Sequence, residues 1–362
     1  DDWARLGVDA HFEGRSPWYS YHEQFRESGA RLVGAKPNEI VMMNSLTVNL
    51  HLMLASFYRP TRSRYKILID FPCFPSDIYA VKSQPAMHRF DPNDAVVMAR
   101  PREGEHCIHP GDIESLLEDH GDVIKLVLLA GVNFFTGQHY DIARIAATAR
   151  REGCTIGLDL AHAAGNVPLA LHDWGIDFAV WCSYKYLNCG PGAVAGCFVH
   201  ERHAQNTSLP RLAGWWGNDP STRFRMHLQP DFEPVTTADA WQLSNPPIFS
   251  MAPLKASLAL FDEAGMSALR AKSQLLTGYL RYLIERMPSE RYEIITPRDP
   301  AAYGCQLSIL AKEDPKGLFK KLEVAGVKGD FREPNVIRVA PVPLYNTFHE
   351  VWRFAGILGG QT

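Results

Sequence analysis

The chain has 362 residues, which is long enough to bury a large core and to divide into two domains. Its formal net charge of −3 argues against a broad nucleic-acid-binding surface, and no run of residues approaches the roughly 18 apolar positions of a membrane span. We find no secretory signal, and the seven cysteines are odd in number and scattered. These features favour reduced thiols in the cytoplasm over a disulfide framework.

Short apolar runs alternate with helical patterns along the first half of the chain. Residues 1–20 are expected to form an ordered arm outside any sheet, and a helix follows at about 23–34. The strand–helix rhythm after this point predicts an α/β fold with a mostly parallel sheet and right-handed crossovers. Strands are expected at 39–43, 65–70, 123–129, 155–158, 178–182 and 193–199, and helices at 47–57, from 78, at 112–120 and at 142–152.

The C-terminal third has a different order of elements. A long helical pattern at about 249–287, interrupted near Gly265, leads into strand, strand, helix, strand and helix. This order predicts a small α+β domain. We therefore expect an N-terminal arm and helix at 1–35, a large domain at 36–250, and a linker helix with the small domain at 251–362.

Polar side chains stand where two successive apolar strands end. Asp159 and His162 follow one strand, and Tyr184 and Lys185 follow the next. Ligands of open α/β sheets bind outside the carboxyl ends of the strands, so we expect these four groups to lie together. An amine that forms a Schiff base and a carboxylate that partners a pyridinium nitrogen are what a pyridoxal phosphate (PLP) enzyme needs. A solvated loop lysine and a helix-capping aspartate explain the same residues, and both interpretations stay open here.

Two other strand ends lead directly into helices. The turn at 44–47 offers free N–H groups and hydroxyls to an anion, although ordinary capping by Ser45 or Thr47 explains it equally well. The strand at 65–70 is followed by an aromatic ring, a hydroxyl and a carboxylate. Of these, Phe74 could cover a flat heteroaromatic ring or belong to the core.

Three further patterns give weaker information about function. The GxGxxA at 190–195 runs into a strand rather than a helix, so we do not interpret it as a dinucleotide site. The histidine pairs at 106/109 and 200/203 lack further ligands nearby in sequence, and we expect no metal site. Trp215 and Trp216 lie in a loop rich in charge and proline, where paired indoles form either contact surface or core.

Seven segments carry a resemblance to a known family. They are MNSLTVNLH (43–51), FPSD (74–77), DLAHAAGN (159–166), WCSYKYLN (181–188), GWWG (214–217), SNPPI (244–248) and RVAPVPLYN (338–346). Together they resemble the kynureninases, hydrolases of tryptophan catabolism and NAD biosynthesis with the fold-type-I, aspartate-aminotransferase-like PLP fold. The resemblance implies cleavage of L-kynurenine or 3-hydroxy-L-kynurenine to anthranilate or 3-hydroxyanthranilate and L-alanine. It also implies that the large domain binds PLP.

The resemblance also implies roles for individual residues around the cofactor. Lys185 would bind the cofactor covalently and act as acid and base at the substrate Cα, and Asp159 would pair with the pyridinium nitrogen. Phe74 would stack on the ring, and His162 would lie near it. The remaining cofactor contacts implied by the resemblance are Leu46, Thr47, Pro75, Ser76, Asp77 and Tyr184, with Trp215 and Asn245 reaching in from the neighbouring subunit of a homodimer.

Substrate contacts are implied in the same way. Arg338 would grip the α-carboxylate, which suits a two-pronged guanidinium, and Tyr184 is the candidate proton donor for the cleavage step. The substrate's aromatic ring would lie among His11, Trp216, Ser244 and Asn245. His11, Ser244 and Asn245 together resemble the eukaryotic form of the family. A site built to bond a ring hydroxyl rejects the analogue without it, so we expect a preference for 3-hydroxykynurenine.

The chain departs from the family pattern at two positions, and three other functions remain open. Ala130 stands where relatives often carry a hydroxyl, and Asn218 follows GWWG where a histidine is common. A cysteine desulfurase would use a mobile thiol such as Cys189, and an aminotransferase would accept a keto acid. A catalytically silent dimeric binding protein is the alternative outside enzymes.

Overall fold

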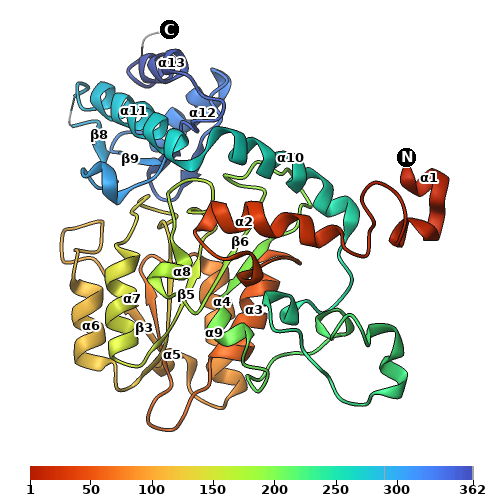
Figure 1. The fold of residues 1–362 in the computed structure, drawn as a ribbon. Helices are drawn as coiled ribbons and strands as arrows, with labels where there is room; N and C mark the ends of the chain where they lie inside the picture. The colour runs from red at the N-terminus through yellow and green to blue at the C-terminus, as the bar shows by residue number, and fades with distance from the viewer. Residues whose placement is uncertain (289, 361–362) are drawn as a thin grey trace.

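A seven-stranded sheet forms the centre of the larger part of the molecule (Figure 1). We describe a computed structural model covering residues 1–288 and 290–360. The strand order is β1-β7-β6-β5-β4-β2-β3, and β7 runs in the direction opposite to that of the other strands of this sheet. The predicted mostly parallel sheet is therefore confirmed, whereas β3 was not predicted. The strands are β1 (Ile40–Met42), β2 (Lys66–Asp70), β3 (Val96–Ala99), β4 (Ile124–Ala130), β5 (Thr155–Asp159), β6 (Phe178–Trp181) and β7 (Gly196–Val199).

The central strands are apolar along their whole length because the sheet is covered on both faces. In β4, Leu126 and Leu128 belong to one core cluster, while Val127 and Leu129 belong to the other. Successive side chains of a strand point to opposite faces, so both faces need apolar residues. The covering helices include α2 (Arg26–Val33), α3 (Leu46–Phe57), α4 (Pro75–Met87), α6 (Asp112–His120), α7 (Ile142–Arg151) and α10 (Ile248–Ala264).

A second, four-stranded antiparallel sheet lies beside the C-terminal helices (Figure 1). Its order is β10-β11-β9-β8, and its core is a separate apolar cluster. The helix pattern breaks at Gly265, where φ is 73°, as the sequence predicts. The elements are α11 (Met266–Ile284), β8 (Tyr292–Ile294), β9 (Leu307–Ala311), α12 (Pro315–Val324), β10 (Asp330–Arg332), β11 (Val336–Val339) and α13 (Phe348–Leu358). The exact domain boundaries at 35 and 250 stay a prediction.

The N-terminal arm stays outside both sheets, as expected. It consists of α1 (Asp2–Leu6) and two 3₁₀ turns, η1 (Gly7–His11) and η2 (Tyr21–Phe25). The large part also contains three one-turn α-helices, α5 (Pro92–Ala95), α8 (Leu171–Trp174) and α9 (Glu201–Ala204), and several short 3₁₀ helices. Within residues 1–288 and 290–360, no helix combines the length and apolar character that a bilayer span needs.

Candidate active site

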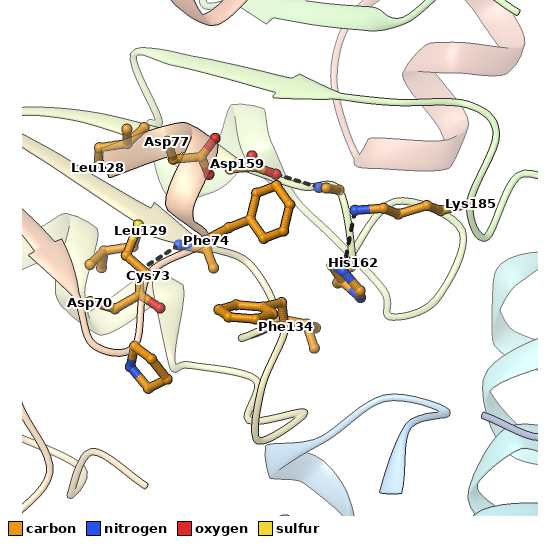
Figure 2. A pocket seen from close by; sticks show the side chains of 14 residues that line it. Asp70, Cys73, Phe74, Asp77, Leu128, Leu129, Phe134, Asp159, His162 and Lys185 are labelled. Carbon is orange, nitrogen blue, oxygen red and sulfur yellow. Dashed lines mark hydrogen bonds between the residues drawn. The ribbon is translucent and has the colours of Figure 1, made fainter. Parts of the chain in front are cut away.

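One pocket lies where the parallel strands of the large sheet end (Figure 2). Residues that close or follow β2, β4, β5 and β6 line it, because the carboxyl ends of parallel strands meet at one edge. The structure thus brings together Asp159, His162 and Lys185, as predicted. The lining side chains are Asp70, Pro72, Cys73, Phe74, Asp77, Leu128, Leu129, Ala130, Val132, Phe134, Asp159, Ala161, His162 and Lys185.

The amine of Lys185 points into this pocket beside an imidazole (Figure 2). Its Nζ lies 3.3 Å from His162 Nε2 and 5.6 Å from the centroid of the Phe74 ring. Burial lowers the pKa of His162 well below its usual value, and the positive charges of Lys185 and Arg338 lower it further. The imidazole is therefore neutral and can accept a hydrogen bond from the lysine.

Two buried carboxyl groups stand opposite the amine. Asp159 accepts a hydrogen bond from the backbone N–H of Ala161 at 2.6 Å, and Asp77 Oδ1 is buried without a hydrogen-bond partner among the described residues. Burial raises the pKa of both carboxyl groups, and the charge of Asp159 raises that of Asp77 further. A buried carboxylate needs a donor or a cation, so this pair fits the N–H of a protonated pyridine ring.

Two helices begin next to one another beside the pocket. The Thr47 hydroxyl in the first turn of α3 lies 3.4 Å from the Ser76 hydroxyl in the first turn of α4. Ser45 occupies the N-cap position of α3, but neither helix start has a side-chain cap hydrogen bond. Free N–H groups at two helix starts and two hydroxyls fit a phosphate. Leu46 belongs to the same turn of α3, and Pro75 and Asp77 belong to the first turn of α4.

Phe74 lines the pocket instead of joining the core. Its side chain is 38% exposed and meets the Phe134 ring edge-on, with centroids 5.4 Å apart. An exposed ring over the lining carboxylates offers a face on which a flat heteroaromatic ring can stack. Tyr184 precedes Lys185 but does not line the pocket, and its side chain is 55% exposed. Burial of its inner part and the neighbouring Cys182 raise the pKa of Tyr184 to about 12.

The five residues that were expected around the substrate ring or from a neighbouring subunit also do not line this pocket within the single chain. Ser244 and Asn245 are exposed, and His11 packs against Trp18 with ring centroids 5.3 Å apart. Trp215 is half-buried against Trp216. Trp216 itself is buried beside Tyr19 and under the Arg223 guanidinium, so the core interpretation holds for this indole.

Arg338 approaches the pocket from the small sheet. It is buried on β11, its Nε donates to Asp330 at 2.6 Å, and its Nη1 donates to the carbonyl of Phe134, a residue that lines the pocket. Asp330, Phe134 and the buried Asp70 were not predicted as site residues. Asp70 had one signal, a carboxylate closing an apolar strand, whereas a lone phenylalanine in a loop and an isolated aspartate had none.

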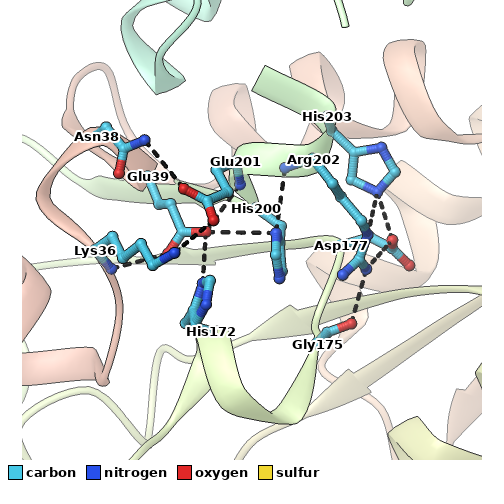
Figure 3. Close-up of polar contacts among 10 residues, drawn as sticks. All are labelled: Lys36, Asn38, Glu39, His172, Gly175, Asp177, His200, Glu201, Arg202 and His203. Atoms are coloured by element: carbon cyan, nitrogen blue, oxygen red, sulfur yellow. Dashed lines mark hydrogen bonds and ion pairs between the residues drawn. The ribbon is translucent and has the colours of Figure 1, made fainter. Parts of the chain in front are cut away.

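A second cluster of titratable groups lies at the opposite end of the sheet, before β1 and β6 (Figure 3). In this cluster His172 and Glu39 lie next to His200. The sequence around His200 did not predict these two neighbours, because neither is close to it in the chain. Glu39 Oε1 lies 2.9 Å from His172 Nδ1 and 3.4 Å from His200 Nδ1. Both carboxylate oxygens already accept backbone N–H groups, from Lys36 and Glu201. The cluster therefore ties α8 and α9 to the start of β1.

Asp177 is a second buried carboxylate in this region (Figure 3). It accepts hydrogen bonds from Arg202 at 2.5 Å, His203 at 2.6 Å and the Ile156 N–H at 2.7 Å. Burial alone would raise the pKa of Asp177, but the bond from His203 and the charge of Arg202 outweigh it and hold the pKa below its usual value.

We expect Asp177→Asn to lower the free energy of unfolding by about 1.5–3 kcal/mol near neutral pH, the value of a hydrogen bond to a charged group. A carboxyl whose pKa is depressed by folding stabilises the fold above its unfolded pKa and loses that contribution as the pH falls through the folded pKa. The difference between wild type and variant should therefore shrink in acid. Denaturant titrations at several pH values measure it, and a difference that stays constant into acid would contradict this assignment.

Comparisons with known proteins agree with the site. The family model described as the kynureninase C-terminal domain matches residues 269–358. The kynureninase of Myxococcus xanthus is 56% identical over 361 residues, which covers 100% of this chain and 84% of that protein.

Solved structures show the same fold at low identity. A cysteine desulfurase from Thermococcus onnurineus superposes with a TM-score of 0.77 at 17% identity, over 99% of this chain and 89% of that one. A C-DES variant with glycine covalently linked to its PLP cofactor gives 0.77 at 18% identity, over 98% and 89%. With more than half of its residues identical to a curated relative along its whole length, the chain belongs to the kynureninase family and is an enzyme of this type.

Proposed function

We propose that the pocket at the end of the large sheet binds PLP and cleaves L-kynurenine or 3-hydroxy-L-kynurenine to an anthranilate and L-alanine. The observation that carries the proposal is one amine, Lys185, that shares a pocket with the buried carboxyl groups of Asp77 and Asp159 and with the exposed ring of Phe74. When bound, the cofactor supplies an electron sink for the electron pair that is left when Cα loses its proton.

The residues of the chain have separate tasks in this proposal. The amine of Lys185 holds the cofactor and moves the proton at the substrate Cα, with the neutral His162 beside it to accept a hydrogen bond. Asp159 accepts the N–H of the protonated pyridine ring, and Phe74 covers the ring face. The first turns of α3 and α4 bind the phosphate, where Ala130 leaves out the hydroxyl common in relatives.

Arg338 binds the substrate α-carboxylate. Its Nε and Nη2 already pair with Asp330, and one Nη1 hydrogen is used by the Phe134 carbonyl. A guanidinium carries five N–H groups, so two remain for the carboxylate. The Asp330 and Phe134 contacts orient these two donors.

The overall reaction uses one water. Its oxygen adds to the γ-carbonyl carbon, the bond from that carbon to Cβ breaks, and the carbonyl fragment leaves as the carboxylic acid of the anthranilate. Cβ receives a proton and becomes the methyl group of alanine. A pKa raised to about 12 keeps Tyr184 protonated at neutral pH, which suits it to donate in this half of the reaction.

Tyr184→Phe should lower kcat by about 10²–10⁴-fold, the usual value of one positioned proton donor. Bound cofactor, measured by its visible absorbance, should stay unchanged because the aromatic ring remains and only its hydroxyl is lost. Tyr79→Phe, at an exposed tyrosine on α4 that does not line the pocket, is the matched control. Normal turnover by Tyr184→Phe would exclude tyrosine 184 as the donor.

A homodimer completes the site in this proposal, with Trp215 and Asn245 reaching the cofactor of the partner subunit. His11, Trp216, Ser244 and Asn245 would surround the substrate ring there. Ser244 and Asn245 are exposed and do not line the pocket of their own chain. Both observations support a role in the site of a partner subunit. We also propose a cytoplasmic location and a place in tryptophan catabolism and NAD biosynthesis.

The polar groups His11, Ser244 and Asn245 support a preference for 3-hydroxykynurenine. We expect kcat/KM to be about 3- to 10-fold higher for 3-hydroxykynurenine than for kynurenine, the value of one neutral hydrogen bond. Ser244→Ala should narrow this ratio without changing the rate with kynurenine. A wild-type preference for kynurenine would overturn the assignment.

A desulfurase activity is less well supported. Cys189 is buried, and burial raises the pKa of its thiol, whereas a mobile nucleophile needs an exposed thiolate. Cys73 lines the pocket, but burial and the nearby carboxylates raise the pKa of its thiol as well. An assay for alanine released from kynurenine, beside one for sulfur released from cysteine and one for amino transfer to a keto acid, separates the candidate activities.

A further inference from the structure

The loop of residues 133–138, which follows β4, joins the two sheets through its backbone. Three successive carbonyls of this loop accept hydrogen bonds from side chains of the small domain. Phe135 O accepts from Ser308 at 2.5 Å, Thr136 O accepts from Thr296 at 2.6 Å, and Phe134 O accepts from Gln306 at 3.1 Å and from Arg338. The Phe134 carbonyl, which accepts a hydrogen bond from Arg338, is thus one of three adjacent carbonyls that are hydrogen-bonded to the small domain.

Asn133 holds the loop from the other side. Its Oδ1 accepts from the N–H groups of Phe135 at 2.9 Å and Thr136 at 3.1 Å, which fixes the turn. Its Nδ2 donates to Asp70 at 2.9 Å and to the Pro72 carbonyl at 3.0 Å. Asp70 and Pro72 line the pocket and lie directly before Phe74 in the chain. The side-chain amide of Asn133 therefore connects the loop to the pocket wall.

Burial makes this network stiff. The side chains of Asn133, Thr136, Thr296, Gln306 and Ser308 are all buried, and each of these side chains has a partner in the network. Buried polar groups cannot exchange a lost partner for water, so a fully paired network has one favoured arrangement. The spacing between the two domains at this point is therefore set by hydrogen bonds rather than by apolar contact alone.

The register of the small sheet links this network to Arg338. Arg338 on β11 is paired directly with Ser308 on β9, whose hydroxyl holds the loop. The ring of Phe134 lines the pocket, and the backbone carbonyl of the same residue accepts a hydrogen bond from the Arg338 guanidinium. We propose that the 133–138 loop positions Arg338 over the pocket, with Ser308 and Thr296 as positioning residues for the substrate carboxylate. This inference rests on the proposed function, in which Arg338 binds that carboxylate.

The test compares two ligands that the enzyme cannot cleave. One is L-kynurenine with its ketone replaced by a methylene group, so that it has neither a carbonyl for water to add to nor a hydroxyl from which the bond to Cβ could break. The other is the same compound without its α-carboxylate. Calorimetry on the cofactor-loaded enzyme gives the dissociation constant of each ligand. The ratio of the two constants measures how much the α-carboxylate contributes to binding, and it is compared between wild type, Ser308→Ala and Thr296→Val. Ser273→Ala is the matched control, because Ser273 is equally buried and its hydroxyl donates to Cys305 instead of the loop.

We expect Ser308→Ala and Thr296→Val to weaken binding of the carboxylate ligand by about 10-fold, as expected for a misplaced guanidinium, and binding of the other ligand by less than about 2-fold. Ser273→Ala should leave the ratio unchanged. Equal weakening of both ligands would overturn the positioning role and leave the proposed function standing. A wild-type enzyme that does not discriminate between the ligands would overturn both. Thr296→Val is nearly isosteric, so it decides the matter if Ser308→Ala does not fold.

Discussion

Replacing Lys185 by alanine is expected to abolish measurable hydrolysis of kynurenine, with a loss of at least about 10⁴-fold. The variant loses the covalent link to the cofactor and the group that moves the proton at Cα, and proton transfer alone typically contributes 10²–10⁴-fold. The visible absorbance of the lysine-bound cofactor should disappear with the activity. Steady-state kinetics and an absorbance spectrum measure the two effects.

Lys82→Ala is the matched control for this experiment. Lys82 lies on α4, where its amine hydrogen-bonds Asn93, and it does not line the pocket. The control should keep both the absorbance band and the turnover of the wild type. If Lys185→Ala kept the band, another amine would hold the cofactor.

Asp159→Asn is expected to give the second-largest loss, about 150- to 5,000-fold in kcat/KM. Removing one partner of a buried ion pair costs about 3–5 kcal/mol, which corresponds to this range. The amide can still accept the hydrogen bond that Asp159 takes from the Ala161 N–H, so the local backbone should keep its conformation. The loss would come from the missing negative charge opposite the pyridine nitrogen.

Asp177→Asn makes the comparison specific. It is the same substitution at a buried carboxylate of the same sheet, but at the end opposite the pocket. Asp177→Asn should lower stability and leave kcat/KM of the folded enzyme near that of the wild type. A similar kinetic loss in both variants would mean that Asp159 acts through folding and not through the cofactor.

The strands that carry the pocket could be predicted from the sequence because the sheet is buried on both faces. Continuous apolar runs mark such strands, and the polar residue that ends each run marks the edge where ligands bind. Asp159, His162 and Lys185 follow two such strands, so their common place in the pocket could be predicted. The predicted helix at 47–57 differs from α3 by one residue at its start, whereas α4 begins at Pro75, three residues before the predicted start at 78. The contact between Thr47 and Ser76 could not be predicted.

Contacts between distant parts of the chain could not be predicted in this way. The Asn133–Asp70 bond, the carbonyls that receive Ser308 and Thr296, and the Glu39 cluster join residues that are far apart in sequence and have no local signature. The strands β3 and β10 were also missed. β10 has only three residues, and β3 only four directly after α5. Trp216 shows the limit of composition, since a polar, proline-rich segment still places this indole in the core.

The most direct test of the account is to find which residue carries the cofactor. Borohydride reduction of the cofactor-loaded enzyme makes the link permanent, and peptide mass spectrometry then locates it. We predict one pyridoxyl-phosphate group per chain, on the peptide that contains Lys185. A modified lysine elsewhere, or an unmodified Lys185 in active enzyme, would contradict the central claim.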